Sequence, residues 1–440
     1  MTHFGLLCPA AAGHLNPMTA LGHELKQRGH RVTLVGMLDA QAKTLAAGLE
    51  FGAVGEQAFP LGSTASALAE LGQLSGLEAL RYTVELFKQQ TILLFDQAPA
   101  AIRQAGIDAL IIDQTSFSGS TIAHHLELPF VSVSCALPLN REPQVPPFNM
   151  TWEYSPSLKA KLRNQLGYTL LTRAAKPITA IVVGRRQSWG LPPFTEIEDR
   201  FSKLAQICQQ PPEFEFPRQN LSPCFHFTGP LTNPQSREPA EFPWDKLTGQ
   251  PLIYASLGTV QNQLTHVFGA IAAACQGLDA QLIIALGGGL APAALGDLPG
   301  NPLVVGYAPQ LELLQRASLT ITHAGLNTVL ESLGNGVPLV AIPIANDQPG
   351  VAARIAWTGT GEVVPLRGID GDQLRVAITT VLGNPSYREN SLRLQASIRQ
   401  AGGVTKAADI VERAIGTGQP VLAQGKPEGE TGDLMRSAPA

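Results

Sequence analysis

Residues 307–350 of the chain read YAPQLELLQRASLTITHAGLNTVLESLGNGVPLVAIPIANDQPG. Its apolar pattern predicts a short helix, a buried strand at Leu319–Thr322, a turn at 323–325, a helix at Asn327–Leu333 and a second strand at Leu339–Ile342. A strand that runs through a glycine turn into a helix leaves free backbone N–H groups at the helix start, and such groups bind anions. The stretch therefore predicts an α/β fold with a phosphate site at this turn.

Residues around the turn are placed where they could contact a nucleotide. Gly325 lets the backbone approach a phosphate closely, and Asn327 and Thr328 could donate hydrogen bonds to phosphate oxygens. Glu331 lies one helical turn later on the same face and could accept from the hydroxyls of a ribose. Each of these residues, taken alone, could equally be a cap or turn residue of an ordinary strand–helix unit.

As a set, the residues of this stretch resemble the donor-binding signature of UDP-sugar-dependent glycosyltransferases, which have two Rossmann-like domains in the arrangement called GT-B. The matching run consists of Pro309, Gln310, His323, Gly325, Asn327, Thr328, Glu331, Ser332, Gly336, Val337, Pro338, Pro343, Asp347 and Gln348. Tyr307 stands where plant members of the family place a tryptophan that stacks on uracil, and Leu326 stands where they place another tryptophan. The resemblance implies a donor site that contains Gly13, Thr259, Tyr307, Ala308, Gln310, His323, Gly325, Asn327, Thr328, Glu331, Asp347 and Gln348.

Length and composition favour a cytoplasmic protein of two large domains. At about 100–200 residues per domain, 440 residues predict two, and 44% hydrophobic residues provide ample core. A formal net charge of −4 shows no excess of basic residues, which argues against nucleic acid as a partner. The five cysteines are scattered without a CxxC pair, so we expect neither a disulfide framework nor a zinc site. No signal peptide is expected, and apolar runs are far shorter than the roughly 20 residues of a membrane span.

The chain divides into two halves that each alternate strand and helix patterns. His3–Cys8, Leu15–Arg28 and Arg31–Gly36 predict a βαβ opening, and the alternation restarts at Leu252 after a Pro-rich segment. The turn after the first strand, CPAAAGHLNP, lacks GxGxxG, which argues against a nicotinamide-dependent oxidoreductase. With the resemblance, we expect an α/β fold of two Rossmann-like domains with parallel sheets that face each other across a cleft. The expected parts are an acceptor-binding domain at 1–231, a linker at 232–250, a UDP-sugar-binding domain at 251–403, a helix returning to the first domain at 404–418 and a disordered tail at 419–440.

His14 and Asp113 are the candidate catalytic pair. His14 follows the end of the first strand, and Asp113 ends another strand of the same predicted sheet, so both belong to the edge where open α/β sheets bind ligands. A carboxylate beside a histidine fixes its tautomer and stabilises the imidazolium, while the helix N-terminus is expected to lower the pKa of His14. Helix capping is the alternative role for each residue. The segment GHLNP with a strand-end aspartate resembles the same glycosyltransferases, which implies that His14 is the base and Asp113 its partner.

Other polar clusters are assigned less specific roles. Thr259, at the end of a strand, could donate to a phosphate or serve as a turn residue. His124 and His125 lie within a predicted helix and are expected to be structural. Asp370-Gly371-Asp372 looks like the metal-binding DxD of another glycosyltransferase class, but it precedes a helix and is better explained as a turn and cap. We find no other metal-ligand cluster and predict no metal and no cofactor besides the sugar donor.

The acceptor half carries a second resemblance. Residues 133–143, VSCALPLNREP, with short segments in both halves, look like bacterial zeaxanthin glucosyltransferases, which act on a carotenoid. The resemblance implies a lipophilic acceptor dissolved in a membrane, and hence peripheral contact with a membrane surface. The segment 138–193 is Pro-rich and irregular, and we expect loops and helices that line an apolar pocket. Its candidate walls are Phe117, Phe148, Trp152 and Tyr154.

The expected reaction is an inverting, metal-independent transfer of glucose from UDP-glucose to a hydroxyl of a lipophilic acceptor such as zeaxanthin. A broad-acceptor enzyme for terpenoids, flavonoids, sterols or macrolides is the first alternative. A non-catalytic relative that assists another transferase is the second, and the presence of both His14 and Asp113 argues against it.

Overall fold

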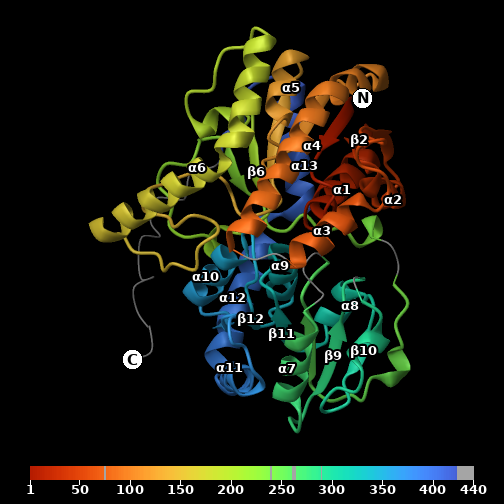
Figure 1. Ribbon diagram of the computed structural model, residues 1–440, viewed down its shortest axis with the longest axis vertical. Coiled ribbons are helices and arrows are strands. Elements are labelled where there is room, and N and C mark those ends of the chain that lie inside the picture. The colour runs from red at the N-terminus through yellow and green to blue at the C-terminus, as the bar shows by residue number, and fades with distance from the viewer. Residues whose placement is uncertain (74–75, 238–239, 260–263, 289, 424–440) are drawn as a thin grey trace.

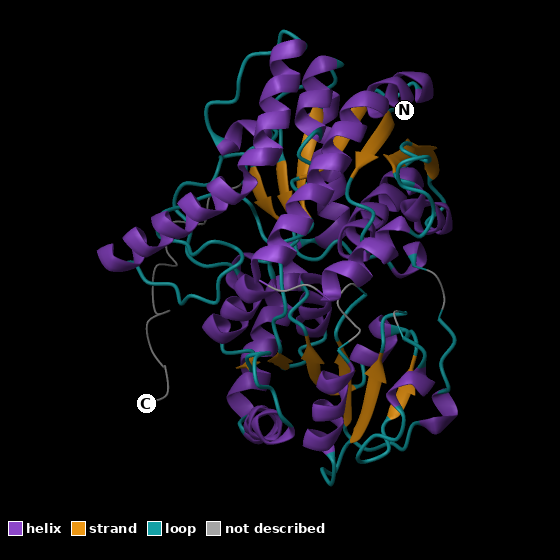
Figure 2. Cartoon of the chain, in the orientation of Figure 1, coloured by secondary structure: helices purple, strands orange, loops and turns teal. Residues whose placement is uncertain are grey.

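The computed structural model describes residues 1–73, 76–237, 240–259, 264–288 and 290–423 of the chain. They form two lobes, each a parallel sheet covered by helices (Figures 1 and 2). One sheet has seven strands in the order β3-β2-β1-β4-β5-β6-β7, and the other has six in the order β10-β9-β8-β11-β12-β13. In both, the order reverses beside the first strand of the lobe, as in doubly wound nucleotide-binding folds. The predicted fold class is confirmed.

The strands of the N-terminal lobe are short apolar runs. Those at its centre, β1, β4 and β5, are buried at every position, as expected for parallel strands covered on both faces. The strands are β1 (His3–Leu7), β2 (Arg31–Gly36), β3 (Glu50–Ala53), β4 (Ala109–Asp113), β5 (Phe130–Ser134), β6 (Gln206–Cys208) and β7 (Phe225–Phe227). The helices are α1 (Ala12–Gln27), α2 (Gln41–Ala46), α3 (Ser63–Gln73), α4 (Gly76–Ala105), α5 (Gly119–His125) and α6 (Leu158–Ser188).

The C-terminal lobe follows the alternation predicted from 307–350. Its strands are β8 (Leu252–Ser256), β9 (Gln281–Ala285), β10 (Leu303–Val305), β11 (Ala317–Thr322), β12 (Leu339–Ala341) and β13 (Gly361–Val363). Its helices are α7 (Thr265–Cys275), α8 (Gln310–Leu314), α9 (Leu326–Gly334), α10 (Gln348–Thr358), α11 (Gly371–Gly383) and α12 (Pro385–Ala401). The cap expected at Asp370 is confirmed, because its side chain accepts from the backbone N–H of Gln373 at 2.8 Å.

The helix α13 (Gly403–Thr417) packs on the N-terminal lobe although it follows the C-terminal one in the chain. Its alanines and its Val411 belong to the same buried cluster as residues of α1 and β1. Arg28 at the end of α1 binds Asp409 at 2.6 Å and Glu412 at 2.7 Å. The chain therefore crosses back and completes the core of the first lobe. The segment 419–440 was expected to be a disordered tail, but residues 419–423 pack on the first lobe, where Val421 is buried and its N–H donates to the carbonyl of Leu204 at 2.8 Å. Residues 424–440 lie outside the described part of the structure.

Two features differ from the expected pattern. The segment 138–193, for which loops and unspecified helices were expected, contains one long helix, α6, whose initial residues project from the body of the molecule (Figure 1). Residues after Pro343, read as a loop, include the start of α10 at Gln348, where Pro349 occupies an early helical position that it tolerates well. Among the described residues, no helix combines the length and apolar character needed to cross a bilayer.

The lobes meet through a buried ion pair. Arg354 on α10 donates from Nε to Glu215 Oε1 of the N-terminal lobe at 3.1 Å, and both side chains are almost fully buried. The guanidinium also lies over the ring of Phe216, 4.4 Å from its centroid. Tyr154 stacks on Phe216 and meets the ring of Trp357 from α10 at 5.3 Å. Because removing one partner of a buried pair leaves an uncompensated charge, this contact fixes α10 against the first lobe.

Candidate active site

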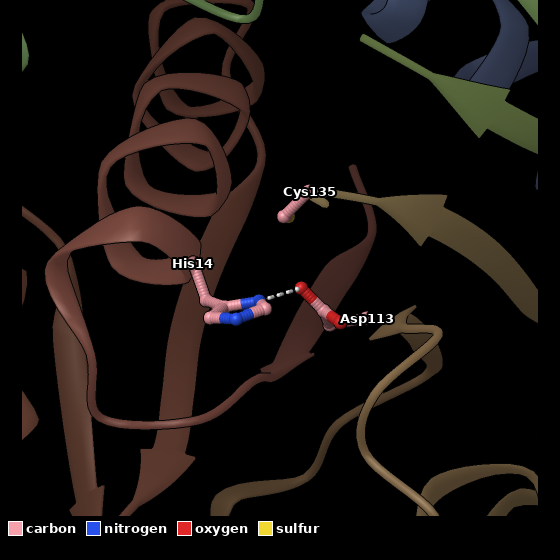
Figure 3. A group of neighbouring side chains, drawn as sticks. All are labelled: His14, Asp113 and Cys135. Carbon is pink, nitrogen blue, oxygen red and sulfur yellow. Dashed lines mark hydrogen bonds and ion pairs between the residues drawn. The ribbon is translucent and has the colours of Figure 1, made fainter. Parts of the chain in front are cut away.

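His14 and Asp113 meet at the carboxyl edge of the first sheet (Figure 3). β1 and β4 are paired in register, with Leu7 opposite Ile112, so the turn after β1 and the last residue of β4 are neighbours. His14 lies in the first turn of α1, and its Nδ1 is 2.8 Å from Asp113 Oδ2. The other carboxylate oxygen accepts from the backbone N–H of Thr115 at 2.7 Å and from its hydroxyl at 2.5 Å. The carboxylate is thus fixed from both sides.

The pair is electrostatically coupled. Burial opposes protonation of His14, but the charge and hydrogen bond of Asp113, with a smaller contribution from Asp347, raise its pKa above the ordinary value of 6.5. Burial works against ionisation of Asp113, but the charge and hydrogen bond of His14 lower the pKa of its carboxyl. The expectation that the helix N-terminus lowers the pKa of His14 is therefore wrong, because the carboxylate in contact outweighs the helix. With Nδ1 facing Asp113, Nε2 is free to take a proton.

Cys135 is the third member of this cluster (Figure 3). Three atoms that could bind a metal, one from each of His14, Asp113 and Cys135, lie within 4.8 Å of one another. The described ranges contain no second cluster of potential metal ligands. Burial and the neighbouring Asp113 carboxylate raise the pKa of the Cys135 thiol well above its ordinary range. Metals bind the thiolate, so a thiol that keeps its proton is better suited to donate to Asp113. The cluster fits a supported His–Asp pair better than a metal centre.

The predicted glycine turn is shaped by His323. Its ring lies so close to two glycines that a Cβ on Gly258 or Gly325 would stand 2.6 or 2.5 Å from ring atoms. Burial lowers the pKa of His323 to about 4, although a hydrogen bond from the ring to the backbone of Ser256 acts to raise it, so the ring is neutral near pH 7. It can therefore contact a diphosphate as a hydrogen-bonding group and not as a charge. The turn leads into α9 beside the loop after β8, where Thr259 is exposed.

Glu331, expected to hold a ribose, is already engaged within the protein. Its buried carboxylate accepts from Gln310 Nε2 at 2.6 Å and pairs with Arg237 of the linker. Gln310 Nε2 also reaches Thr328 Oγ1 at 3.4 Å, and its Oε1 accepts from the hydroxyl of Tyr254 at 3.1 Å. Three donor-site candidates thus form one network beside α9. Arg237 was not predicted as a site residue, because the Pro-rich linker carries no periodic pattern.

The candidates just before α8 differ in exposure. Tyr307 is 47% exposed, which suits a platform for a base, whereas the neighbouring Ala308 is buried at 6% and can offer only its backbone. Tyr307 supplies an aromatic ring at the position where the plant pattern has a tryptophan. Its assignment as the uracil platform stays a prediction.

Asn327 connects the two lobes. Its Nδ2 donates to the carbonyl oxygen of Gly13 at 3.0 Å, and its Oδ1 accepts from Gln209 Nε2 at 2.8 Å. Gln209 Nε2 also donates to the carbonyl of Cys135. A chain of hydrogen bonds therefore joins the start of α9 to the residue before His14. Gln209 was not identified from the sequence, although its position just after β6, at a strand end, is one where functional polar residues are expected.

Asp347 and Gln348 lie at the start of α10. Asp347 Oδ2 accepts from the backbone N–H of Leu137 at 3.2 Å, so this side chain also spans the lobes. Burial raises the pKa of Asp347, although the hydrogen bond from Leu137 and the charge of His14 each act to lower it. Gln348 Oε1 accepts from the backbone N–H groups of Ile344 and Ala345, each at 2.8 Å, and holds its own loop. The roles of both residues toward a sugar remain predictions.

The predicted acceptor residues do not gather in one place. Phe117 lines two small cavities, about 20 and 30 Å³, one of which also contacts Asp113. Phe148 lies against α10, where its carbonyl would be 2.1 Å from a Cβ on Gly350. Trp152 lies under Arg163, 4.8 Å away, and Tyr154 belongs to the aromatic contact between the lobes. Of the four, Phe117 is the one placed beside the His–Asp pair.

Comparison with known proteins identifies relatives over nearly the whole chain. The sequence profile described as "UDP-glucoronosyl and UDP-glucosyl transferase" matches residues 192–402. A zeaxanthin glucosyltransferase of Pantoea ananas is 35% identical over 96% of this chain and 98% of its own. Another, from Pseudescherichia vulneris, is 34% identical over 96% of this chain and 100% of its own. The solved structure of CalG4, the calicheamicin glycosyltransferase, shares the fold, with a TM-score of 0.72, 23% identity and coverage of 96% and 100%.

Proposed function

The chain belongs to the UDP-glucoronosyl and UDP-glucosyl transferase family and is a glycosyltransferase, and on this premise we propose that it transfers glucose from UDP-glucose to a hydroxyl of a lipophilic acceptor. The observation that carries the proposed mechanism is the His14–Asp113 hydrogen bond at the sheet edge. The two zeaxanthin glucosyltransferases, similar over nearly the full chain, support the choice of donor sugar and acceptor class.

In the proposed reaction, His14 acts as general base. The acceptor oxygen attacks the anomeric carbon from the face opposite UDP while its proton passes to Nε2 of His14. The bond from the anomeric carbon to the UDP oxygen breaks, and UDP leaves with the electron pair, so the configuration inverts. Asp113 stabilises the imidazolium that forms, which its hydrogen bond to Nδ1 and its burial favour.

The departing diphosphate needs stabilisation, and the start of α9 can supply it. The free N–H groups after Gly325 and the positive end of the helix dipole favour an anion there. Neutral His323, exposed Thr259 and the α9 side chains are the further candidate donors. We propose that these groups stabilise UDP without a divalent metal.

The proposal is tested with purified protein, UDP-glucose and a panel of acceptors: zeaxanthin, a sterol, a flavonoid and a macrolide. We expect mass spectrometry to show hexose added to zeaxanthin, NMR to show a β-glucoside, and a His14→Ala control to form almost none. Efficient transfer to the other acceptors with little to zeaxanthin would favour the broad-acceptor alternative. UDP binding without transfer to any acceptor would favour the non-catalytic alternative and would contradict the proposal.

A further inference from the structure

α6 carries a row of exposed leucines on the half that projects from the body of the molecule, at the left of Figure 1. They follow one another at intervals of four residues, which places them along one face of the helix. This leucine stripe consists of Leu158, Leu162, Leu166 and Leu170, exposed by 73%, 59%, 62% and 51%. Single exposed leucines are common on proteins, but an aligned set on one helix marks an interaction surface.

The opposite face of the same half holds α6 to the protein. Ala160, Asn164 and Gly167 are buried. Asn164 Nδ2 donates to the carbonyl of Pro143 at 3.1 Å, and a Cβ on Gly167 would be 3.0 Å from the ring of Trp152. Residues two apart on a helix lie about 200° apart around its axis, so this anchoring turns the leucine stripe away from the body. The stripe is therefore accessible without any rearrangement.

The charge of α6 is unlike that of the chain. The helix contains no Asp or Glu, whereas the whole chain has a formal charge of −4. Its basic residues are Lys159, Lys161, Arg163, Arg173, Lys176, Arg185 and Arg186. Arg185 pairs with Asp96, and Arg186 is buried, so these two face the protein. The other five, on the half with the stripe or just after it, form no ion pair with any part of the chain that the structure describes.

We propose that the leucine stripe of α6 docks on an anionic phospholipid surface. The leucines would enter the boundary between head groups and acyl chains, and the unpaired lysines and arginines beside them would contact lipid phosphates. A helix with an apolar row, basic neighbours and no acidic residue has the composition of helices that lie in the membrane interface. Trp357, 44% exposed and in contact with Tyr154 just before α6, adds a side chain of the type enriched at such interfaces.

A second copy of the chain is the competing occupant, and charge argues against it. Pairing two stripes would bring the unpaired basic residues of both helices together without an acidic residue from either α6. An anionic bilayer supplies the missing negative charge and an apolar layer at the same surface. Docking goes beyond the proposed reaction and does not require it. It would place the acceptor lobe next to a membrane-dissolved substrate.

The leucines are tested by vesicle flotation with the full chain. Wild type should float with vesicles of phosphatidylcholine and phosphatidylglycerol and bind vesicles of phosphatidylcholine alone about tenfold less. The double variant Leu162→Gln, Leu166→Gln should bind the anionic vesicles about tenfold less than wild type, because it removes part of the inserted apolar surface. A matched control, Leu45→Gln with Leu61→Gln, replaces leucines that are 53% and 74% exposed elsewhere and should bind like wild type.

The charges are tested separately. Lys159→Glu with Lys176→Glu should abolish the preference for anionic vesicles, whereas Arg388→Glu with Arg393→Glu on α12 should keep it. Circular dichroism and transfer to a small water-dispersed phenol should be unchanged in all variants, which separates docking from folding and from the proposed reaction. Equal vesicle binding by wild type and the leucine variant would overturn the proposal. So would a wild-type dimer, seen by light scattering, that the leucine variant converts to monomer.

Discussion

Asp113→Asn should lower turnover by about 10–150-fold. The native carboxylate is 1% exposed and accepts from His14 Nδ1 at 2.8 Å and from both Thr115 donors. Asparagine keeps the shape but removes the charge that stabilises the imidazolium. A hydrogen bond to a charged group is worth about 1.5–3 kcal/mol, and this range converts to the predicted loss. His14→Ala should cost about 10²–10⁴-fold, since it removes the proposed base itself.

The pH profile gives the sharper test. The base must be neutral, so kcat/KM of wild type should fall as pH drops through the raised pKa of His14, above 6.5. In Asp113→Asn the main influences that raise this pKa are lost, while burial, which lowers it, remains. The acid limb of the variant should therefore move to lower pH although its maximum rate is smaller. A variant that had only lost its fold would lose rate without this displacement.

The assay follows UDP release and glucoside formation together across the pH range. Asp372→Asn on α11 and His266→Ala on α7 change exposed residues of the same types and should leave rate and profile unchanged. The double variant His14→Ala, Asp113→Asn should be little worse than His14→Ala, because the two residues act as one unit. An acid limb that stays in place in Asp113→Asn, or additive losses in the double variant, would show that Asp113 does not support His14 as a base.

Further predictions concern the donor, the metal and the acceptor. If the Glu331 carboxylate contacts the ribose, Glu331→Gln should weaken UDP binding about 10–150-fold in calorimetry. If the carboxylate only pairs with Arg237, the substitution should lower the melting temperature and leave UDP affinity unchanged. Asp347→Ala should keep UDP affinity but reduce discrimination between UDP-glucose and UDP-galactose in competition assays, and a loss of UDP itself would contradict the sugar contact. Activity measured after treatment with EDTA should equal that of untreated protein. Phe117→Ala should raise the acceptor KM more than Trp152→Ala does, with the KM for UDP-glucose unchanged in both, because Phe117 alone of the two lines the cavities near Asp113.

The parallel architecture was predictable because local pattern and tertiary environment agree in it. Strands such as β4 and β11 are short apolar runs that end at a polar residue or a turn, and the structure buries nearly all of their residues. α6 was harder to predict, because its exposed face carries leucines and only a few small residues are buried on its first half. When the apolar row of a helix faces outward, its periodicity does not indicate which face of the helix is buried.

The site was predictable where strand ends dictate proximity. His14 follows β1 and Asp113 is the last residue of the paired strand β4, so their positions in the sequence placed them at the same sheet edge. Contacts between lobes were not predictable in this way, because no local pattern relates a residue to a distant surface. Gln209 and Arg237 complete the networks around Asn327 and Glu331 from segments without a motif. The direction of the His14 pKa shift also depended on a distance that only the structure supplies.

The packing of α13 on the first lobe affects how the protein folds during translation and how its lobes can be exchanged with those of relatives. Residues 403–417 leave the ribosome only after the whole C-terminal lobe, yet they supply buried side chains to the core of the N-terminal lobe. That lobe cannot complete its core during translation, and its apolar surface beside α1 stays uncovered until synthesis has passed α13. Exchange of C-terminal lobes between relatives must therefore keep α13 with the lobe it covers, with one crossover near residue 250 and another near residue 402.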